Sequence, residues 1–447
     1  MTGQRSGDVA LPHSIAHLTA TRTCRFETEP PMVIEHREAL AFMLQEAAEL
    51  EHLIMCQYLF AAFSLKRSTD EGVTAEQLEA IDRWRRTVTR VAKDEMLHLA
   101  LVQNLLVAIG WGPHFERPPL PAPAHHFPPG VQFELMPFGE RALRHFLFLE
   151  RPEGISIDDA EGFGAVARAQ PYSAHVEEGE IVPHPQEFAT VGHLYRAIAQ
   201  GLDRLVEKHG ESRVFVGPPQ AQASSAAFGW PELTPVLDLA SARAACDTIV
   251  EQGEGARGDW RDAHFGRFHD IYDELLLITE RDPDFAPARP ALAGVVRPAA
   301  DPSPPLIGDH TTSHVADLFN VTYEVLLQAL ARYYVEADGS DEPRGVLADV
   351  AVGIMFDAIR PLGELLTTMP FGSERPGATA GPTFEVFFES GYVLPHRHAA
   401  WVLLEERLRE AAEFARRIEH QRGTPLADIA QKLDGHAERI AAGGTAT

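Results

Sequence analysis

A stretch of thirty residues without glycine or proline constrains the fold of this chain most. Residues 36–65, HREALAFMLQEAAELEHLIMCQYLFAAFSL, carry apolar side chains at helical spacing. The pattern predicts one long helix that starts at Glu35 and is broken at Asp70-Glu71-Gly72. Such a helix gains its stability mainly by packing an apolar face against other helices, and it therefore indicates a helical bundle.

Further helical patterns follow along the whole chain. A second helix is expected from Thr74, where Gln77 completes a capping box, to about Ile109, where glycines end it. Strand-like alternation is scarce, so the chain is predicted to be all-α with long loops. The remaining helices are expected at 136–150, from 188, from 241 with an interruption and a restart at 263–277, and at 311–336, 344–368, 396–421 and 425–440.

The distribution of proline and glycine suggests how the chain is divided. Residues 1–34 are expected to be a flexible lead-in, and residues 35–281 to form the bundle. The segment 282–308 is rich in proline and lacks periodicity, which is typical of a linker. Residues 309–447 are then a C-terminal helical region.

Charge and composition exclude several classes of function. The formal net charge of −26 argues against nucleic-acid binding, which needs a basic surface. No stretch of about 18 uncharged apolar residues predicts a membrane span, and the first thirty residues lack a secretory signal, so the cytosol is the expected compartment. Cys24, Cys56 and Cys246 predict neither a disulfide framework nor a Cys-x-x-Cys pair. The sequence leaves homo-oligomerisation open.

A Glu-x-x-His motif lies on the second expected helix. Its members, Glu95 and His98, are three residues apart, so both side chains lie on one face and can reach a single metal ion. The same spacing also occurs on solvated helix faces. Here the surrounding turn is mostly apolar, with Met96, Leu97 and Leu99, and a buried Glu and His would need partners. This context favours metal ligation.

The first helix carries several carboxylates within its apolar run. Glu46 and Glu49 fit a solvent-facing stripe. Glu51 differs because Tyr58 follows two turns later on the same face. A glutamate followed by a tyrosine at this distance resembles the arrangement in ferritins, where the glutamate ligates metal and the tyrosine packs beside it. Glu51 is therefore a third expected ligand.

Di-iron carboxylate proteins built on four helices use one Glu from each of two helices and Glu-x-x-His from each of the other two. Glu51, Glu95 and His98 would supply half of such a site. On the third helix the inward-facing candidate is His193, with Glu187 as a substitute. A core histidine that is only hydrogen-bonded is an equal alternative for His193.

The fourth helix lacks Glu-x-x-His and is interrupted by the glycines of QGEGARGD. Glycine lowers helix stability by about 1 kcal/mol relative to alanine, and such breaks often mark sites where the backbone is redirected towards a ligand. Glu254 and His264 are expected to be the last two ligands, with Glu251 as the alternative to Glu254. A continuous helix would hold Glu254 and His264 about 15 Å apart, so the glycine-rich break must fold the chain back.

Several segments together resemble a known family. ELEHLIMCQYLFAAFSL, AKDEMLHLALVQNLLVAIG, TVGHLYRAI and IVEQGEG with AHFGRF are similar to the bacterial ferritin-like family named for iminophenyl-pyruvate dimer synthase. The resemblance covers roughly residues 35–280. It implies a ferritin-like four-helix bundle with long loops, followed by the C-terminal helical segment, and a role in bacterial natural-product biosynthesis. The named dimer synthases join two oxidised-tryptophan imines.

Three functions are consistent with these observations. The first is a non-haem iron oxidoreductase, with two iron ions, that acts with dioxygen on an amino-acid-derived small molecule. The second is an imine-dimer synthase with coupling chemistry; haem is disfavoured because no Cys-x-x-Cys-His fixes an axial histidine. The third is a non-catalytic metal-binding scaffold protein. Iron content and an optical spectrum distinguish the three.

Overall fold

The computed structural model describes residues 32–122, 132–155, 157–160, 182–183, 185–186, 188, 190–255, 259–298, 304–337, 341–387 and 396–445. The protein is all-α, as predicted, and the described residues form β-structure only as isolated bridges. The helices of the first part are α2 (Arg37–Ser64), η1 (Thr69–Glu71), α3 (Ala75–Ala108), α4 (Glu140–Leu149), α5 (Val191–His209), α6 (Glu211–Val214), η2 (Pro219–Ala221), α7 (Ser225–Phe228), α8 (Leu239–Gly253) and α9 (His264–Arg281). The C-terminal part contains α10 (His310–Val335), α11 (Asp341–Ile354), the π-helix η3 (Met355–Ile359), α12 (Arg360–Leu366), α13 (Arg397–Arg422) and α14 (Ala427–Thr445).

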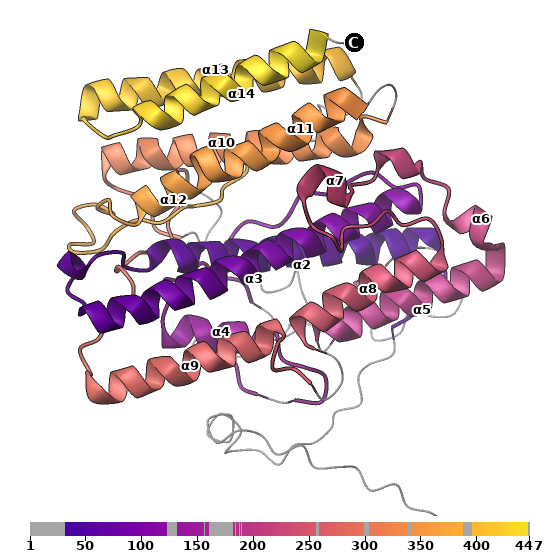
Figure 1. Ribbon diagram of the computed structural model, residues 1–447, viewed down its shortest axis with the longest axis horizontal. Coiled ribbons are helices and arrows are strands. Elements are labelled where there is room, and N and C mark those ends of the chain that lie inside the picture. The colour runs from indigo at the N-terminus through magenta and orange to yellow at the C-terminus, as the bar shows by residue number, and fades with distance from the viewer. Residues whose placement is uncertain are drawn as a thin grey trace, which may run out of the picture.

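The helices α2 and α3 form the central pair of the molecule and pack against each other along their length (Figure 1). The predicted capping box starts α3: Thr74 accepts a hydrogen bond from the backbone N–H of Gln77, whose side chain in turn binds the N–H of Thr74. Most residues of α2 are buried, because both of its sides are covered by other helices. This explains why its apolar residues are not confined to one face.

Two shorter helix pairs cover one side of α2 and α3, in place of two continuous helices. The helix α5 packs against α8, and α4 packs against α9, and Figure 1 shows the two pairs side by side below the central pair. The third and fourth helices of the bundle are therefore each divided, α4 from α5 and α8 from α9. The end of α4, the start of α5, the end of α8 and the start of α9 lie near the middle of α2 and α3 (Figure 1).

The C-terminal helices form a second layer on the opposite side of the central pair. In this layer α10 packs against α11 and α13, α14 packs against α13, and α12 contacts α2 (Figure 1). The Pro-rich segment before α10 is bound to the end of α2 and to η1 through Arg289. The backbone N–H of Arg289 donates to the carbonyl of Ser64 at 2.8 Å, and the Arg289 guanidinium pairs with Glu71 at 2.6 Å. Whether residues 282–308 separate two folding units stays a prediction.

The buried core is continuous from the central pair, α2 and α3, into α10 and α13 of the C-terminal layer. Cys56 and Cys246 are buried free thiols. Among the helices that the structure describes, none combines the length and apolar character needed to cross a membrane.

Candidate metal centre

Five buried side chains gather where the divided helices meet the central pair. They form two groups, in each of which the potential ligand atoms lie within 4.8 Å of one another. Each group contains two carboxylates and one imidazole, which is a typical ligand set for iron. The first group is Glu51, Glu95 and His98, and the second is Glu95, Glu150 and His264.

Glu95 belongs to both groups and uses a different oxygen in each. Its Oε2 lies 2.9 Å from Nδ1 of His98, and its Oε1 lies 2.9 Å from Nδ1 of His264. A second carboxylate approaches the same nitrogen of each imidazole: Glu51 lies 3.6 Å from Nδ1 of His98, and Glu150 lies 3.6 Å from Nδ1 of His264. A single carboxylate thus lies between two sites of the same composition.

The outer nitrogens of both histidines are held by other side chains. Nε2 of His98 lies 3.0 Å from the amide oxygen of Gln252, and Nε2 of His264 lies 3.3 Å from the carboxylate of Asp94. Because these oxygens accept hydrogen bonds, each Nε2 carries the proton and donates it. Nδ1 is then free to act as a ligand, and such outer partners orient ligating histidines.

Two tyrosines fix the outer carboxylates in a matching way. The hydroxyl of Tyr195 on α5 donates to Glu51 at 2.6 Å, and the hydroxyl of Tyr58 on α2 donates to Glu150 at 2.5 Å. Burial raises the pKa of both tyrosines well above its usual value, and the neighbouring carboxylates raise it further. Both phenols therefore stay protonated and act as hydrogen-bond donors.

The electrostatics of the centre are those of a site that attracts cations. Burial raises the pKa of Glu51, and the nearby Glu95 raises it further against the opposing effect of His98. Although burial favours the neutral imidazole, the adjacent carboxylates raise the pKa of both His98 and His264. Although burial would raise the pKa of Glu95, the two histidines lower it. Without metal, protons on the histidines hold the carboxylates together, and a metal ion would displace them.

The polar atoms at the centre fit a metal ion better than they fit one another. Among the described residues, Oε1 of Glu95 and Nδ1 of His264 have no well-aligned hydrogen bond, although both are fully buried. Unsatisfied buried polar atoms are costly. Without metal, a proton on Nδ1 of His264 relieves the 2.9 Å contact with Oε1 of Glu95. When His264 is neutral, Asp94 holds its proton on Nε2, and two lone pairs would face each other at this distance. A cation between Glu95 and His264 removes this repulsion, so the residues present fit a metal ion.

The structure brings together four of the six residues that the sequence proposes as ligands. Glu51, Glu95, His98 and His264 meet in the two groups, whereas Glu254 belongs to neither. The break between α8 and α9 exists, and His264 is the first residue of α9, which places it at the centre.

Glu254 turns away from the centre and stabilises the start of α5. It accepts a hydrogen bond from the backbone N–H of Gly192 at 2.6 Å and a longer one from Glu153 at 3.3 Å. A carboxylate is favoured here because the N-terminus of a helix carries unpaired N–H groups and a partial positive charge. Gly192 is required for this contact, since a Cβ at that position would lie 2.5 Å from a Glu254 oxygen. In this structure Glu254 and His264 therefore do not share a ligand group, in contrast to the expectation from the sequence.

The remaining candidate ligands of the third and fourth helices also lie apart from the two groups. His193 is buried near the start of α5, and its backbone N–H donates to the Thr190 side chain at 3.1 Å, but it is in neither group. Glu251 is exposed on α8. Glu187 lies outside the described residues.

Sequence reasoning missed Glu150, which occupies the place expected for the glutamate of the third bundle helix. It is the residue directly after α4, and it is 4% exposed. The available signal was a glutamate that follows the apolar run FLFL and precedes Arg151-Pro152, at the end of a predicted helix. The expectation for Glu46 also needs correction, because Glu46 is buried.

The comparison with known protein families agrees with this architecture. The model of the Ferritin-like family matches residues 44–273, which contain all five clustered residues. This chain belongs to the Ferritin-like family. A solved ferritin-like protein from Caulobacter vibrioides is 21% identical, with a TM-score of 0.47, over 78% of this chain and 99% of that chain.

Two curated relatives match most of the chain. It is 29% identical to the dichlorochromopyrrolate synthase of Lentzea aerocolonigenes, over 86% of this chain and 39% of the relative. It is 27% identical to the 2-imino-3-(indol-3-yl)propanoate dimerase of Chromobacterium violaceum, over 79% of this chain and 34% of the relative. The match thus covers well under half the length of these relatives.

Proposed function

We propose that this protein is an iron-dependent enzyme of natural-product biosynthesis that oxidises an amino-acid-derived small molecule with dioxygen. The observation that carries the proposal is the pair of buried ligand groups that share Glu95. Glu51, Glu95 and His98 would hold one iron ion, and Glu95, Glu150 and His264 the second. Iron bound by histidine and carboxylate ligands with open positions activates dioxygen.

The protein's own contribution is a fixed and dry set of ligands. Tyr58 and Tyr195 hold the outer carboxylates, so Glu150 and Glu51 keep their positions when a metal enters or leaves. The centre is enclosed by apolar side chains, including Phe146 and Phe268, whose rings pack against Tyr58. This surface excludes bulk water, and electrostatic interactions are stronger in such an environment.

The ligand set departs from the four-helix di-iron pattern at one position. That pattern has four glutamates and two histidines, whereas the two groups here contain three glutamates and two histidines. The residue three positions before His264 is Arg261, where the pattern has a glutamate. With one carboxylate fewer, the centre would have room for a substrate or dioxygen beside the ligands, which favours a catalytic role over iron storage.

The substrate class is inferred from the two curated relatives. Their names refer to dichlorochromopyrrolate and to an imino acid with an indole side chain, 2-imino-3-(indol-3-yl)propanoate. A second candidate function, the coupling of two imino acids, rests on the name of the Chromobacterium violaceum relative, a dimerase. In that case iron would be haem-bound or auxiliary. The carboxylates next to Nδ1 of both histidines favour non-haem iron over haem.

Metal analysis with an optical spectrum of freshly purified protein tests the proposal. We expect two iron ions per chain and no Soret band. The protein is then mixed with 2-imino-3-(indol-3-yl)propanoate in an oxygen electrode. Oxygen uptake that depends on both iron and the imine supports the proposal, whereas dimer formation without oxygen uptake, or a Soret band, favours the second candidate. Absence of stoichiometric metal contradicts both and favours a scaffold protein.

A further inference from the structure

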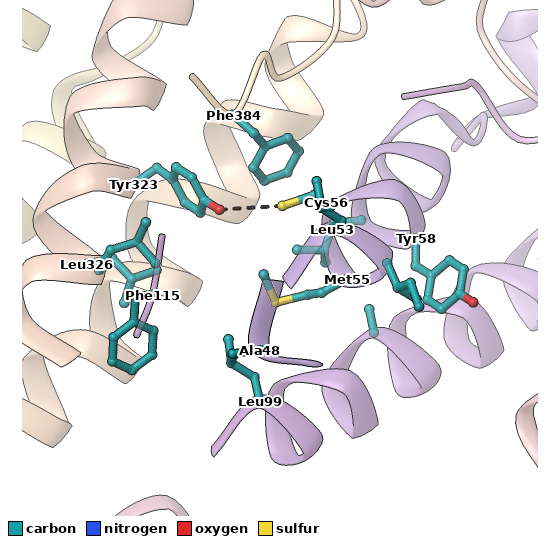
Figure 2. Packing of buried hydrophobic residues seen from close by; sticks show 14 of the residues in the cluster. Ala48, Leu53, Met55, Cys56, Tyr58, Leu99, Phe115, Tyr323, Leu326 and Phe384 are labelled. Carbon is teal, nitrogen blue, oxygen red and sulfur yellow. Dashed lines mark hydrogen bonds between the residues drawn. The ribbon is translucent and has the colours of Figure 1, made fainter. Parts of the chain in front are cut away.

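A cavity of about 490 Å³ lies on the side of α2 and α3 opposite the metal centre. It is bordered by α2 and α3 on one side and by α10, η3 and α12 on the other. Met55 and Leu59 of α2 line it, whereas Tyr58 points the other way, towards Glu150 (Figure 2). The central helix pair therefore separates this cavity from the metal centre.

The inner wall of the cavity is apolar and large enough for an organic ligand. Leu59, Met96 and Leu99 come from the central pair, and Leu326 and Leu330 come from α10. Figure 2 shows Phe115 and Leu326 on the α10 side facing Met55 and Leu99. Small-molecule sites typically have volumes of about 300–1,000 Å³ and a mostly apolar lining.

The lining of the cavity has the opposite charge to the rest of the protein. Six of its residues are Arg or Lys and one is Glu364, whereas the whole chain has a net charge of −26. Glu364 is already engaged by Arg67 at 2.5 Å and by Arg360 at 2.8 Å. The acidic residue of the lining is thus neutralised, and the positive charge remains.

Three of the cations form a stripe along α3. Arg86, Arg90 and Lys93 follow one another at intervals of four and three residues, so they lie on one helix face. All three are exposed, and none has an ion-pair partner among the described residues. Like charges at this spacing repel one another. An anion bound to this stripe would relieve the repulsion among the three cations.

The wall opposite the stripe is irregular. The π-helix η3 contributes Met355, Phe356 and Ile359 to the lining. The Phe356 ring is 49% exposed, and the ammonium group of Lys93 lies 5.5 Å from its centre. π-helical turns are rare and occur frequently at functional sites. An exposed aromatic ring at the mouth offers a stacking or packing surface next to the cations.

We propose that this cavity binds a small organic anion, namely an extended apolar body that ends in one carboxylate. The body occupies the space between α3 and α10, and the carboxylate lies at Arg86, Arg90 and Lys93. A neutral ligand leaves these cations unpaired, and a large polyanion is repelled by the acidic protein as a whole. The proposal does not depend on the metal centre or its chemistry.

Titration of the full-length protein with a fluorescent anion tests the proposal. The probe is 1-anilinonaphthalene-8-sulfonate, and its neutral counterpart N-phenyl-1-naphthylamine has the same rings without the charge. We expect one saturable site per chain and an affinity for the anion that is roughly tenfold higher than for the neutral probe. Decanoate should displace the anion more effectively than 1-decanol. Equal affinities for the two probes, or equal displacement by acid and alcohol, overturn the proposal.

A pair of double variants locates the site. Arg86→Ala with Arg90→Ala should weaken binding of the anionic probe roughly tenfold and leave the neutral probe unchanged. The control is Arg204→Ala with Lys208→Ala on α5, which removes two exposed cations that have no described ion pair and lie outside the cavity. An equal loss in both double variants overturns the proposal, because the charge effect would then be unspecific.

A further variant separates this site from the metal centre. Glu95→Ala should leave probe binding unchanged, since Glu95 does not line the cavity. Loss of the probe in this variant, with the melting temperature maintained, would place binding at the metal centre and overturn the proposal. If iron-dependent oxygen uptake is not observed, the expected binding of the probe to the cavity is unaffected. The two proposals are therefore tested independently.

Discussion

Nδ1 of His264 lies 2.9 Å from Oε1 of Glu95. Glu95 lies within α3, whereas His264 is the first residue of α9. Their contact therefore depends on where the divided fourth helix restarts. The same is true of Glu150, which directly follows the last residue of α4. The candidate metal centre is built from two residues at helix ends and three within continuous helices.

Glu95 is expected to be essential for both iron ions. Glu95→Ala removes the carboxylate between the two groups, and we expect the iron content to fall from about two ions per chain to none. Helicity should be retained, since the apolar faces stabilise the bundle. Iron is measured by atomic absorption and helicity by circular dichroism. Glu251→Ala, an exposed position on α8, is the control and should keep its iron. One ion retained in Glu95→Ala would show that Glu95 does not bridge.

The two outer glutamates are expected to act on one ion each. Glu51→Ala should remove the ion of the first group and Glu150→Ala the ion of the second, because each residue belongs to one group only. Each variant should retain about one iron ion per chain. Iron-to-protein ratios measured after dialysis provide the test. Loss of both ions in either variant would indicate a single cooperative site.

The tyrosine hydrogen bonds are expected to tighten metal binding. Tyr58→Phe and Tyr195→Phe keep the ring packing but remove the hydroxyls that hold Glu150 and Glu51. We expect iron affinity to fall by about 10- to 100-fold, as is typical for outer partners of metal ligands. Competition with a chelator measures the affinity. Tyr272→Phe, which removes a 3.4 Å contact with Glu140, is the matched control and should have no effect.

Glu254 is expected to make stability depend on pH. Burial raises its pKa to about 7, above the ordinary value of 4.5, although the backbone N–H of Gly192 opposes the shift. The folded state then binds the proton more tightly than the unfolded state. The resulting stabilisation is fully present below pH 4.5 and is lost as the pH rises through 7.

Glu254→Gln removes this dependence. Between pH 5 and pH 8 the free energy of unfolding of the parent protein should fall by about 2–3 kcal/mol more than that of the variant. Urea denaturation of metal-free protein at the two pH values measures this difference. Iron content should be unaffected, because Glu254 is outside both ligand groups. Parallel pH profiles for the two proteins would refute the shifted pKa.

Local sequence patterns determined the helices and part of the candidate metal centre. The capping box at Thr74 and Gln77 starts α3 as predicted. Glu95 and His98 share a helix face because their spacing alone places them there. Glu51 and Tyr58 lie on one face of α2 for the same reason, and each takes part in the centre. These relationships lie within single helices, so the period of the helix is sufficient to predict them.

The partners from other helices were decided by tertiary structure. Glu254 and His264 are similar candidates in the sequence, yet Glu254 binds the start of α5 and His264 turns to Glu95. Glu150 reaches the centre because α4 ends beside Tyr58. Local periodicity carries no information on where a divided helix restarts or which end it faces. That depends on how α4, α5, α8 and α9 pack on the central pair, and packing is a property of the whole fold.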